Sequence, residues 1–203
     1  MEASKADPAE QKKWVDNDKK TREKAGENDS FSFVDGVHPQ HNGHPAYGWF
    51  EKGVEHTILA NSGRQRVNIN GAVNIDTLEV EVDFTDSINS ESMKRLMEQL
   101  SRGHPIGVVS MILDNARYCP SKAVEEYRQD LGNIVFIFLP TYLPHLNLIE
   151  RLWKFFKKTT FYNKYYEKFT DFTQACKGFL KNIKKHEHAL RSLLAENFHM
   201  QKN

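Results

Sequence analysis

Hydrophobic and polar residues follow three different patterns along the chain, and each pattern predicts a different kind of element. Residues 78–84 alternate strictly, with acids between the apolar positions, which predicts a half-exposed outer strand. The continuous apolar runs at 107–113 and 134–139 predict strands that are buried on both faces. Residues 90–101 repeat apolar positions at helical spacing, which predicts a helix with Ser90 as its N-cap.

The other expected elements complete an alternating order. Strands are expected at 31–34, 47–50, 56–60 and 66–75, and helices at 120–131, 147–158, 169–183 and 188–198. Several antiparallel strands therefore precede a series in which helices alternate with buried strands. Such strand–helix–strand units place parallel neighbours in one sheet. We predict an α/β fold, in which a mixed sheet carries helices on both faces.

The first thirty residues differ from the rest of the chain. They are polar and highly charged, and Trp14 is their only large apolar residue. We predict a charged helical N-terminal arm over residues 1–30 that lies outside the core, followed by one domain over residues 31–203. A chain of 203 residues, 39% hydrophobic and 27% charged, suits one such domain and excludes collagen-like, coiled-coil and wholly disordered proteins.

The sequence carries no pattern typical of export or membrane insertion. No run approaches the ~18 apolar residues of a membrane span, and no apolar stretch follows the charges of the N-terminus. Cys119 and Cys176 are too few for a disulfide framework. We therefore expect a cytoplasmic protein without a membrane partner.

Charge is unevenly distributed along the chain. The net charge is +1, but residues 147–203 hold 12 Lys and Arg against 5 Asp and Glu. This basic quarter could meet a polyanion along one face, or it could simply be a solvated helical face.

Two of the expected strands end in an aspartate. Asp35 follows the apolar run at 31–34, and Asp114 follows the run at 107–113. If these strands are neighbours, both carboxylates emerge at the same edge of the sheet. Adjacent carboxylates repel unless a cation lies between them, and their hard oxygens suit Mg²⁺ or Mn²⁺. Turn chemistry explains the same residues equally well, because Asp-Gly and Asp-Asn are common turn pairs.

A third candidate carboxylate, Glu150, lies near the start of the helix expected at 147–158. At ~100° per residue, Glu150, Lys154 and Lys157 fall within roughly 60° of one another, beside the apolar side of the helix. A carboxylate among ammonium groups could be a metal ligand at a site where the ammonium groups bind the phosphates of a nucleic acid. Spacing alone favours a plainer role, because Asn147 and Glu150 fit a capping box and Glu150 and Lys154 form an i,i+4 pair. The apolar positions are Ile149, Leu152, Trp153 and Phe156.

Three segments, taken in order, resemble a known family. They are FVDGVHPQHN around Asp35, LDNARY around Asp114 and LPHLNLIERLWKFFKK around Glu150. They are similar to the catalytic motifs of DDE-type transposases, and more narrowly to those of bacterial insertion-sequence transposases allied to the mariner superfamily. The resemblance runs from about residue 29 to the C-terminus and includes YGWFEKG and GRQRVNINGAVN. The motif Leu-Asn-x-Ile-Glu-Arg-Leu-Trp is long enough to be specific.

The resemblance implies a fold, a cofactor and an activity. The fold would be ribonuclease H-like, with a mixed five-stranded sheet over residues 31–203. Asp35, Asp114 and Glu150 would be catalytic and would hold two Mg²⁺ or Mn²⁺ ions. One ion would activate a water or a DNA 3′-hydroxyl, and the other would stabilise the leaving oxygen. The protein would cut DNA at insertion-sequence ends and join those ends to target DNA.

The resemblance also implies partners, and two other functions stay open. The partners would be DNA and a second copy of the chain, and the place of action would be the bacterial nucleoid. One alternative is a catalytically silent remnant that binds DNA or dimerises. The other is a related ribonuclease H-like nuclease that acts on RNA–DNA hybrids or junctions.

The chain departs from the family pattern at two places. Leu143 and His145 stand just before Glu150, where relatives usually carry a small residue and an Asp or Asn, so the support of the metal site is in question. Relatives also carry helix-turn-helix modules ahead of the catalytic domain, whereas only the polar residues 1–30 precede it here. The chain would then be the second of two reading frames, a fragment, or a domain that works with such a module in a separate chain.

Further side chains are candidates for contacts with DNA. They are Arg64, Arg66, Arg117, Lys154, Lys157 and Lys158. A surface strand explains Arg64 and Arg66 equally well. The aromatic residues of 161–169 could stack on bases or pack the C-terminal helices onto the sheet. The spacing of His38, His41 and His44 invites a zinc site, but the interleaved prolines and glycine favour a loop.

Overall fold

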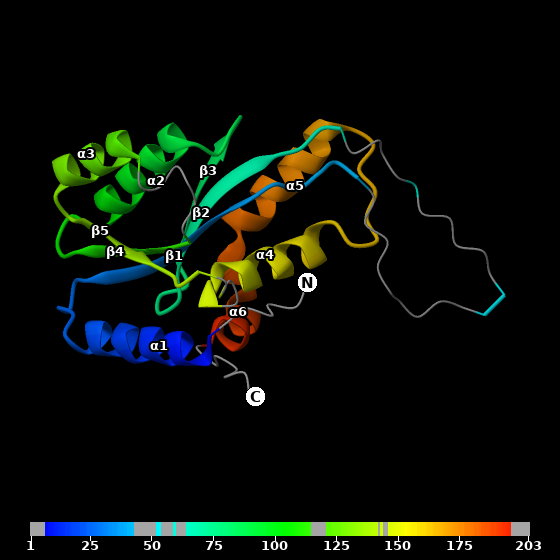
Figure 1. Ribbon diagram of the computed structural model, residues 1–203. Helices are drawn as coiled ribbons and strands as arrows, with labels where there is room; N and C mark the ends of the chain where they lie inside the picture. Colours follow the sequence, from blue (N-terminus) through cyan, green and yellow to red (C-terminus); the bar gives the residue numbers. More distant parts are fainter. Residues whose placement is uncertain are drawn as a thin grey trace.

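A five-stranded mixed sheet with helices on both faces forms the centre of the molecule, as the sequence predicts (Figure 1). The computed structural model describes residues 7–42, 52–53, 59, 64–114, 121–141, 143 and 146–195. The spatial order of the strands is β3-β2-β1-β4-β5. The strands are β1 (Ser30–Val37), β2 (Asn68–Asn74), β3 (Val80–Thr85), β4 (Val109–Leu113) and β5 (Ile134–Phe138). Pairing is antiparallel from β3 through β1 and parallel from β1 through β5.

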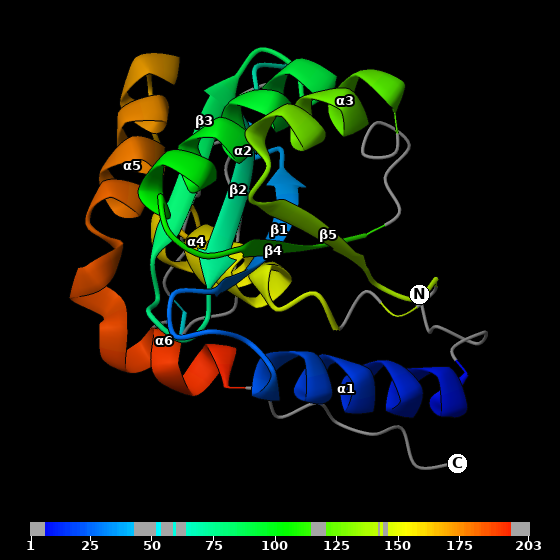
Figure 2. The same cartoon turned by 90° about the vertical axis from the view of Figure 1, so that its left-hand side faces the viewer.

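Different helices cover the two faces of the sheet (Figures 1 and 2). The helices are α1 (Pro8–Glu23), α2 (Ser90–Gly103), α3 (Lys122–Leu131), α4 (Ile149–Thr160), α5 (Phe169–Lys181) and α6 (Glu187–Leu194), with a 3-10 turn at Ile183–His186. The face that packs against α2 and α3 is called the α2 face below, and the face that packs against α4, α5 and α6 the α4 face. Successive side chains of a strand point to opposite faces of the sheet, so β1 contributes to both cores. Phe33 belongs to the α4-face core and Val34 to the α2-face core.

The strand β5 is not buried on both faces, so that prediction is wrong. Its apolar sequence lies at the edge of the sheet, where Val135 is 41% and Phe138 is 39% exposed. An apolar run shows the composition of a strand but not its place in the sheet. In the described part of the chain, β5 pairs only with β4, so its other edge is open. The outer position predicted for residues 78–84 is confirmed, because β3 forms the opposite edge.

Two details at the ends of elements also differ from expectation. The N-cap of α2 is Asn89 rather than Ser90, because the Asn89 carboxamide oxygen accepts hydrogen bonds from the main-chain N–H groups of Glu91 and Ser92. The helix predicted at 188–198 corresponds to the short α6, which begins at Glu187 directly after the 3-10 turn, and residues 196–198 lie outside the described residues. The strands expected at 47–50 and 56–60 lie outside the described residues, apart from Leu59.

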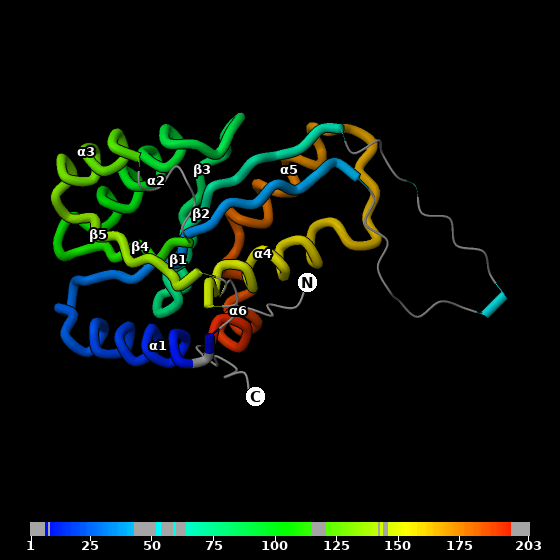
Figure 3. The backbone as a smooth tube through the Cα atoms, in the orientation of Figure 1, coloured from blue at the N-terminus to red at the C-terminus, as the bar shows by residue number. Residues whose placement is uncertain are grey.

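The N-terminal helix α1 is docked on the domain and lies beside α6 (Figures 2 and 3). Trp14 and Val15 are partly buried against the α4-face core, although the sequence predicts an arm outside the core. Arg22 connects the far end of the helix to β1, because its guanidinium lies 4.6 Å from the centre of the Phe31 ring. Within the helix, the same guanidinium lies 2.8 Å from the Asp18 carboxylate. The boundary at residue 30 between arm and domain stays a prediction.

Helix α5 contributes a buried cysteine to the α4-face core. Cys176 is fully buried together with Phe172 and Leu180 on the inner side of the helix. Burial raises the pKa of the Cys176 thiol to about 12. No helix in the described ranges is long and apolar enough to cross a membrane.

Candidate active site

The parallel pairing of β1 and β4 brings Asp35 and Asp114 next to each other. The last paired residues are Val34 and Leu113, so the two aspartates are the next residues on their strands. Asp35 lies within β1 rather than at its end, because β1 continues two residues further along β2, where Asp35 pairs with Gly71. Asp114 directly follows β4, as predicted.

Both aspartates lie on the α4 face. Phe33 and Ile112, two residues before Asp35 and Asp114, are paired across the strands and belong to the α4-face core. Side chains two residues apart on a strand share a face. The neighbouring strands predicted for the two carboxylates are thus confirmed, together with their common edge.

Helix α4 carries Glu150 in its first turn and lies across this face. Its predicted apolar side is confirmed, because Ile149, Leu152, Trp153 and Phe156 are all buried. The close approach of the helix depends on Gly71, the cross-strand partner of Asp35. A Cβ atom at residue 71 would lie only 2.7 Å from Cη2 of the Trp153 ring. A glycine within a strand is typical of such an approach, so GRQRVNINGAVN contained this signal.

The capping box proposed for Glu150 is absent. The N-cap of α4 is Leu148, without a side-chain hydrogen bond to the helix end. Asn147 instead donates a hydrogen bond from Nδ2 to the main-chain oxygen of Val34 at 3.1 Å. Glu150 is exposed at the start of the helix, and its pairing with Lys154 is also absent in the described part of the chain.

The three carboxylates act on one another electrostatically. The pKa of Asp35 is raised to about 7, first by burial and then by the negative charges of Asp114 and Glu150. The pKa of Glu150 is also raised, first because the groove partly desolvates its carboxyl although the residue as a whole is exposed, and then by the charge of Asp114. Lys157 opposes both shifts, and the N–H of Gly36 opposes the first. The structure therefore brings the three predicted residues together as a group with too much negative charge.

Such a group suits hard divalent cations. Carboxylate oxygens are the ligands that Mg²⁺ and Mn²⁺ prefer, and a cation would relieve the repulsion that raises the pKa of Asp35. Among the residues that the structure describes, no three Asp, Glu, His or Cys side chains already surround one point as a cage for a single ion. The three carboxylates are thus coupled electrostatically, but they are not assembled as a ready-made metal site.

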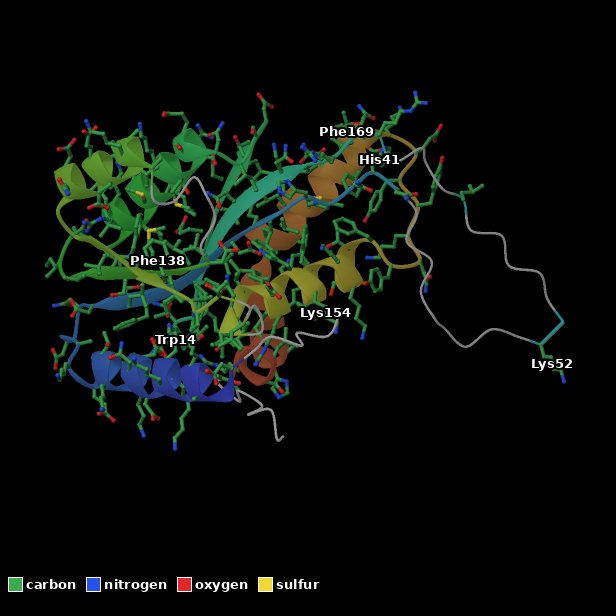
Figure 4. The ribbon with its side chains drawn as sticks, in the orientation of Figure 1. Trp14, His41, Lys52, Phe138, Lys154 and Phe169 are labelled. Atoms are coloured by element: carbon green, nitrogen blue, oxygen red, sulfur yellow. The ribbon has the colours of Figure 1, made fainter. Side chains whose placement is uncertain are left out.

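Asp35 and Glu150 open onto a groove of about 560 Å³ between β1 and α4. The side of the groove formed by α4 is basic, and Figure 4 shows Lys154 projecting from that helix. Acids beside β1 and lysines on the helix give the groove places for both cations and phosphates. The residues around it include Asp35, Glu150, Lys154, Lys157, His38 and Tyr162.

Of the other candidate DNA contacts, the three that the structure describes do not line this groove. Arg66 lies in a smaller depression of about 270 Å³ between β3 and α5. Arg64 and Lys158 are exposed elsewhere on the surface. Arg117 falls outside the described residues.

Leu143 and His145 are the two residues before Glu150 that depart from the family pattern, and the structure describes only Leu143. Leu143 is 1% exposed and belongs to the α4-face core, so it fills a packing position. His145 falls outside the described residues.

The histidines near β1 have separate surroundings. The Nδ1 atom of His38 lies 2.7 Å from the side-chain oxygen of Asn68. His41 is buried, with its Nε2 atom 2.7 Å from the main-chain oxygen of Tyr166 and its ring beside Phe169 (Figure 4). His41 therefore packs the loop after β1 against α5, and His44 lies outside the described residues.

Some aromatic residues of the segment 161–169 pack the C-terminal helices, and others lie at the surface, where stacking on bases stays a prediction. Phe161 is buried and stacks on Phe172, so it packs the helices together. Tyr162 lies at the groove, and Tyr165 is 43% exposed. The sequence reading missed three contributions to this site: the hydrogen bond of Asn147 to β1, the fit of Trp153 over Gly71, and the position of His38.

Comparison with known proteins agrees with this geometry. The chain resembles the Mos1 transposase paired-end complex with left transposon end at 13% identity, with a TM-score of 0.62 over 93% of this chain and 61% of that chain. It resembles the Mos1 mariner paired end complex with Mn at 14% identity, with a TM-score of 0.62 over 92% and 60%. These likenesses confirm the ribonuclease H-like fold, and this chain spans about three fifths of the length of those proteins.

The family is shown by the sequence itself. No curated protein matches the chain. A family model described as DDE superfamily endonuclease matches residues 30–173, a span that holds the parallel strands, both aspartates and helix α4. The match covers more than half of the sequence, and the chain therefore belongs to the DDE superfamily endonucleases.

Proposed function

We propose that this chain is a transposase catalytic domain that cleaves DNA at the ends of an insertion sequence and transfers those ends to target DNA. The observation that carries the proposal is the electrostatic coupling of Asp35, Asp114 and Glu150 beside a groove that Asp35 and Glu150 line, where burial and then the two like charges raise the pKa of Asp35 to about 7. Structural acids are normally paired with cations, so an acid cluster beside a basic rim indicates a site for metal ions and phosphates.

We propose that the three carboxylates hold two Mg²⁺ or Mn²⁺ ions. Mos1 complexes with Mn and with Mg have the same fold, which supports this choice of metals. When bound, such ions supply an activated oxygen nucleophile and stabilise a leaving oxygen at a phosphodiester. Asp35 would be one of these ligands, because it lines the groove between β1 and α4 together with Glu150. Lys154 and Lys157 would hold the DNA phosphates at the rim.

The remaining basic candidates would contact DNA further from the groove. Arg64, Arg66, Arg117 and Lys158 belong to this proposed outer set. Phosphate contacts of this kind position DNA but read no sequence, so we expect weak and nonspecific binding by the chain alone.

The whole assembly is part of the proposal. The Mos1 structures are described as paired-end complexes, which supports a homodimer as the active form. A helix-turn-helix module in a separate chain would supply sequence recognition, because contacts to phosphates read no sequence. The bacterial cytoplasm, at the nucleoid, is the corresponding place of action.

Cleavage of DNA that ends in the element's inverted repeats tests this function. We expect nicked and joined products with Mg²⁺ or Mn²⁺ and none with EDTA. Asp114→Asn and Glu150→Gln should each abolish both products while thermal melts show a folded protein, because each change removes a ligand charge at nearly constant volume. Undiminished nicking by either variant would remove that residue from the site. DNA binding without cleavage by the wild type would support the silent remnant, and preferential cleavage of RNA–DNA hybrids would support the related nuclease.

A further inference from the structure

Asn147 forms the connection between β1 and the start of α4. Its side chain is 2% exposed, and Nδ2 donates to the main-chain oxygen of Val34 at 3.1 Å. Its own main-chain oxygen accepts the N–H of Glu150 at 3.1 Å. One residue is therefore hydrogen-bonded both to the residue before Asp35 and to Glu150.

The bond to Val34 lies where the parallel pairing of the sheet ends. Val34 and Leu113 are the last paired residues of β1 and β4, and the main-chain oxygen of Leu113 already accepts the N–H of Leu139. Beyond Val34, β1 no longer pairs with β4, and Asp35 is the next residue of β1. Asn147 adds a side-chain donor at this position and ties β1 to the helix that carries Glu150.

Stability alone does not favour an asparagine at this position. Its Oδ1 atom is buried and has no hydrogen-bond partner among the described residues. A buried acceptor without a partner carries a desolvation cost, which an apolar side chain of similar size would avoid. The amide is therefore better explained by the geometry that its donor imposes than by a contribution to stability.

We propose that Asn147 is a positioning residue that sets the separation between the Asp35 and Glu150 carboxylates, and so the affinity of the site for divalent ions. The inference rests on the proposed metal-dependent function. Groups that hold metal ligands in place typically contribute 10- to 100-fold to metal affinity. Aspartate cannot replace Asn147, because a carboxylate has no N–H to donate and would add a fourth negative charge.

Mn²⁺ titrations of the folded protein, well below the melting temperature, test this role without measuring activity. We expect Asn147→Ala to weaken Mn²⁺ binding about 10- to 100-fold and Asn147→Asp to weaken the Mn²⁺-induced thermal shift as well. The matched control is Asn182→Ala, because Asn182 donates from Nδ2 to the main-chain oxygen of Gly178 at 2.8 Å at the end of α5. This control should lose stability but keep the Mn²⁺ affinity of the wild type.

The outcomes separate this inference from the proposed function. A folded Asn147→Ala protein with wild-type Mn²⁺ affinity would overturn the positioning role and leave the metal site standing. A wild type that binds no Mn²⁺ would overturn the metal site, and the positioning role with it. If Asn147→Ala does not fold, Asn147→Ser, which keeps a shorter donor, serves in its place. We then expect an intermediate affinity, and an unchanged one would contradict the proposal.

Discussion

Asp35 and Asp83 are aspartates on strands of the same sheet, but they have opposite surroundings. Asp83, on the α2 side of β3, accepts hydrogen bonds from Nε and Nη2 of Arg95 at 3.1 and 2.7 Å. Asp35, on the α4 face of β1, is surrounded by the negative charges of Asp114 and Glu150, and the N–H of Gly36 and the charge of Lys157 oppose their effect on its pKa. One acid is neutralised by a fixed arginine, and the other is left with repelling neighbours.

The difference separates a structural acid from a functional one. The guanidinium of Arg95 matches a carboxylate with two donors, and its own pKa is raised by this contact. A chain that can neutralise Asp83 in this way could do the same at Asp35 if stability were the only requirement. No arginine pairs with Asp35 among the residues that the structure describes, which supports the proposal that a bound cation balances its charge.

Substitution by asparagine should produce the largest contrast between the two acids. We expect Asp35→Asn to reduce cleavage of element-end DNA by at least about 100-fold, because it removes a charge from a proposed metal ligand. Asp83→Asn should keep cleavage, because its carboxylate faces Arg95 on the other face of the sheet. Initial rates of nicking at saturating Mn²⁺ measure both changes. Equal losses in the two variants would remove the distinction.

The stability of the metal-free protein should depend on pH through Asp35. The unfolded carboxyl loses its proton near its ordinary value of 3.8, whereas the folded one keeps it to about pH 7. Over this interval the folded state binds more protons, so the free energy of unfolding falls as pH rises from 4 and levels off above about 8. We expect a total loss on the order of 2–4 kcal/mol.

Melts in EDTA from pH 5 to 8.5 measure this dependence, and Asp35→Asn is its control. The difference in stability between the variant and the wild type should grow with pH, because only the wild type carries the titrating carboxyl. Mn²⁺ should reduce the difference by stabilising the charged form. A constant difference over this range would contradict the raised pKa.

Gly71, the partner of Asp35 across β2, should tolerate no side chain. A Cβ atom there would lie 2.7 Å from the Trp153 ring, so Gly71→Ala should displace α4 and cost about 1–3 kcal/mol of stability. Gly178→Ala is the matched control, because its Cβ atom would meet nothing within 4 Å and alanine favours the interior of α5. Urea titrations measure both, and the tryptophan emission of Gly71→Ala should also shift. Destabilisation by Gly178→Ala alone would contradict this account of the packing.

Removing the structural pair should have a modest effect. Arg95 is 48% exposed, so its ion pair with Asp83 is partly screened by solvent. We expect Arg95→Ala to reduce the free energy of unfolding by about 1 kcal/mol. Salt should weaken the effect, and the double variant with Asp83→Asn should show coupling between the two residues. Additive losses would mean that the pair contributes nothing beyond its separate residues.

The smallest expected effect is at Lys157, the only cation identified as acting on both Asp35 and Glu150 among the described groups. Lys157→Ala should weaken DNA binding a few-fold and reduce the salt slope by about one. Lys122→Ala is the control, because Lys122 is exposed on α3 at the other face and pairs with Glu126. Fluorescence anisotropy over a salt series measures the slope. Equal slopes for both variants would exclude a phosphate contact at Lys157.

Much of the fold could be predicted from the sequence, because hydrophobic periodicity records which side chains are buried. The strict alternation of residues 78–84 placed β3 correctly at an edge, but its acidic side does not simply meet solvent, because Asp83 is buried beside Arg95 of α2. The run at 134–139 was misassigned, because the position of β5 depends on which strands pair beyond it. Composition does not contain that information.

The candidate site was partly predictable for a different reason. Asp35 and Asp114 could be placed together because parallel strands bring their carboxyl ends to one edge. The role of Asn147 could not be predicted, because its spacing to Glu150 fits a capping box and its true acceptor, Val34, is 113 residues away in sequence. Local spacing favours local partners, and the tertiary contact overrides them.

The labelling rate of the buried Cys176 thiol would measure how often α5 opens locally from the core. Alkylating reagents react with the thiolate, and a pKa of about 12 leaves about one thiol in 10⁴ ionised at pH 8 while the closed core also excludes the reagent. In a Cys119→Ser background, labelling of Cys176 would therefore proceed only when α5 separates from the sheet. Its rate would give the opening equilibrium of the helix that supports one side of the α4 face, without any probe added to the chain.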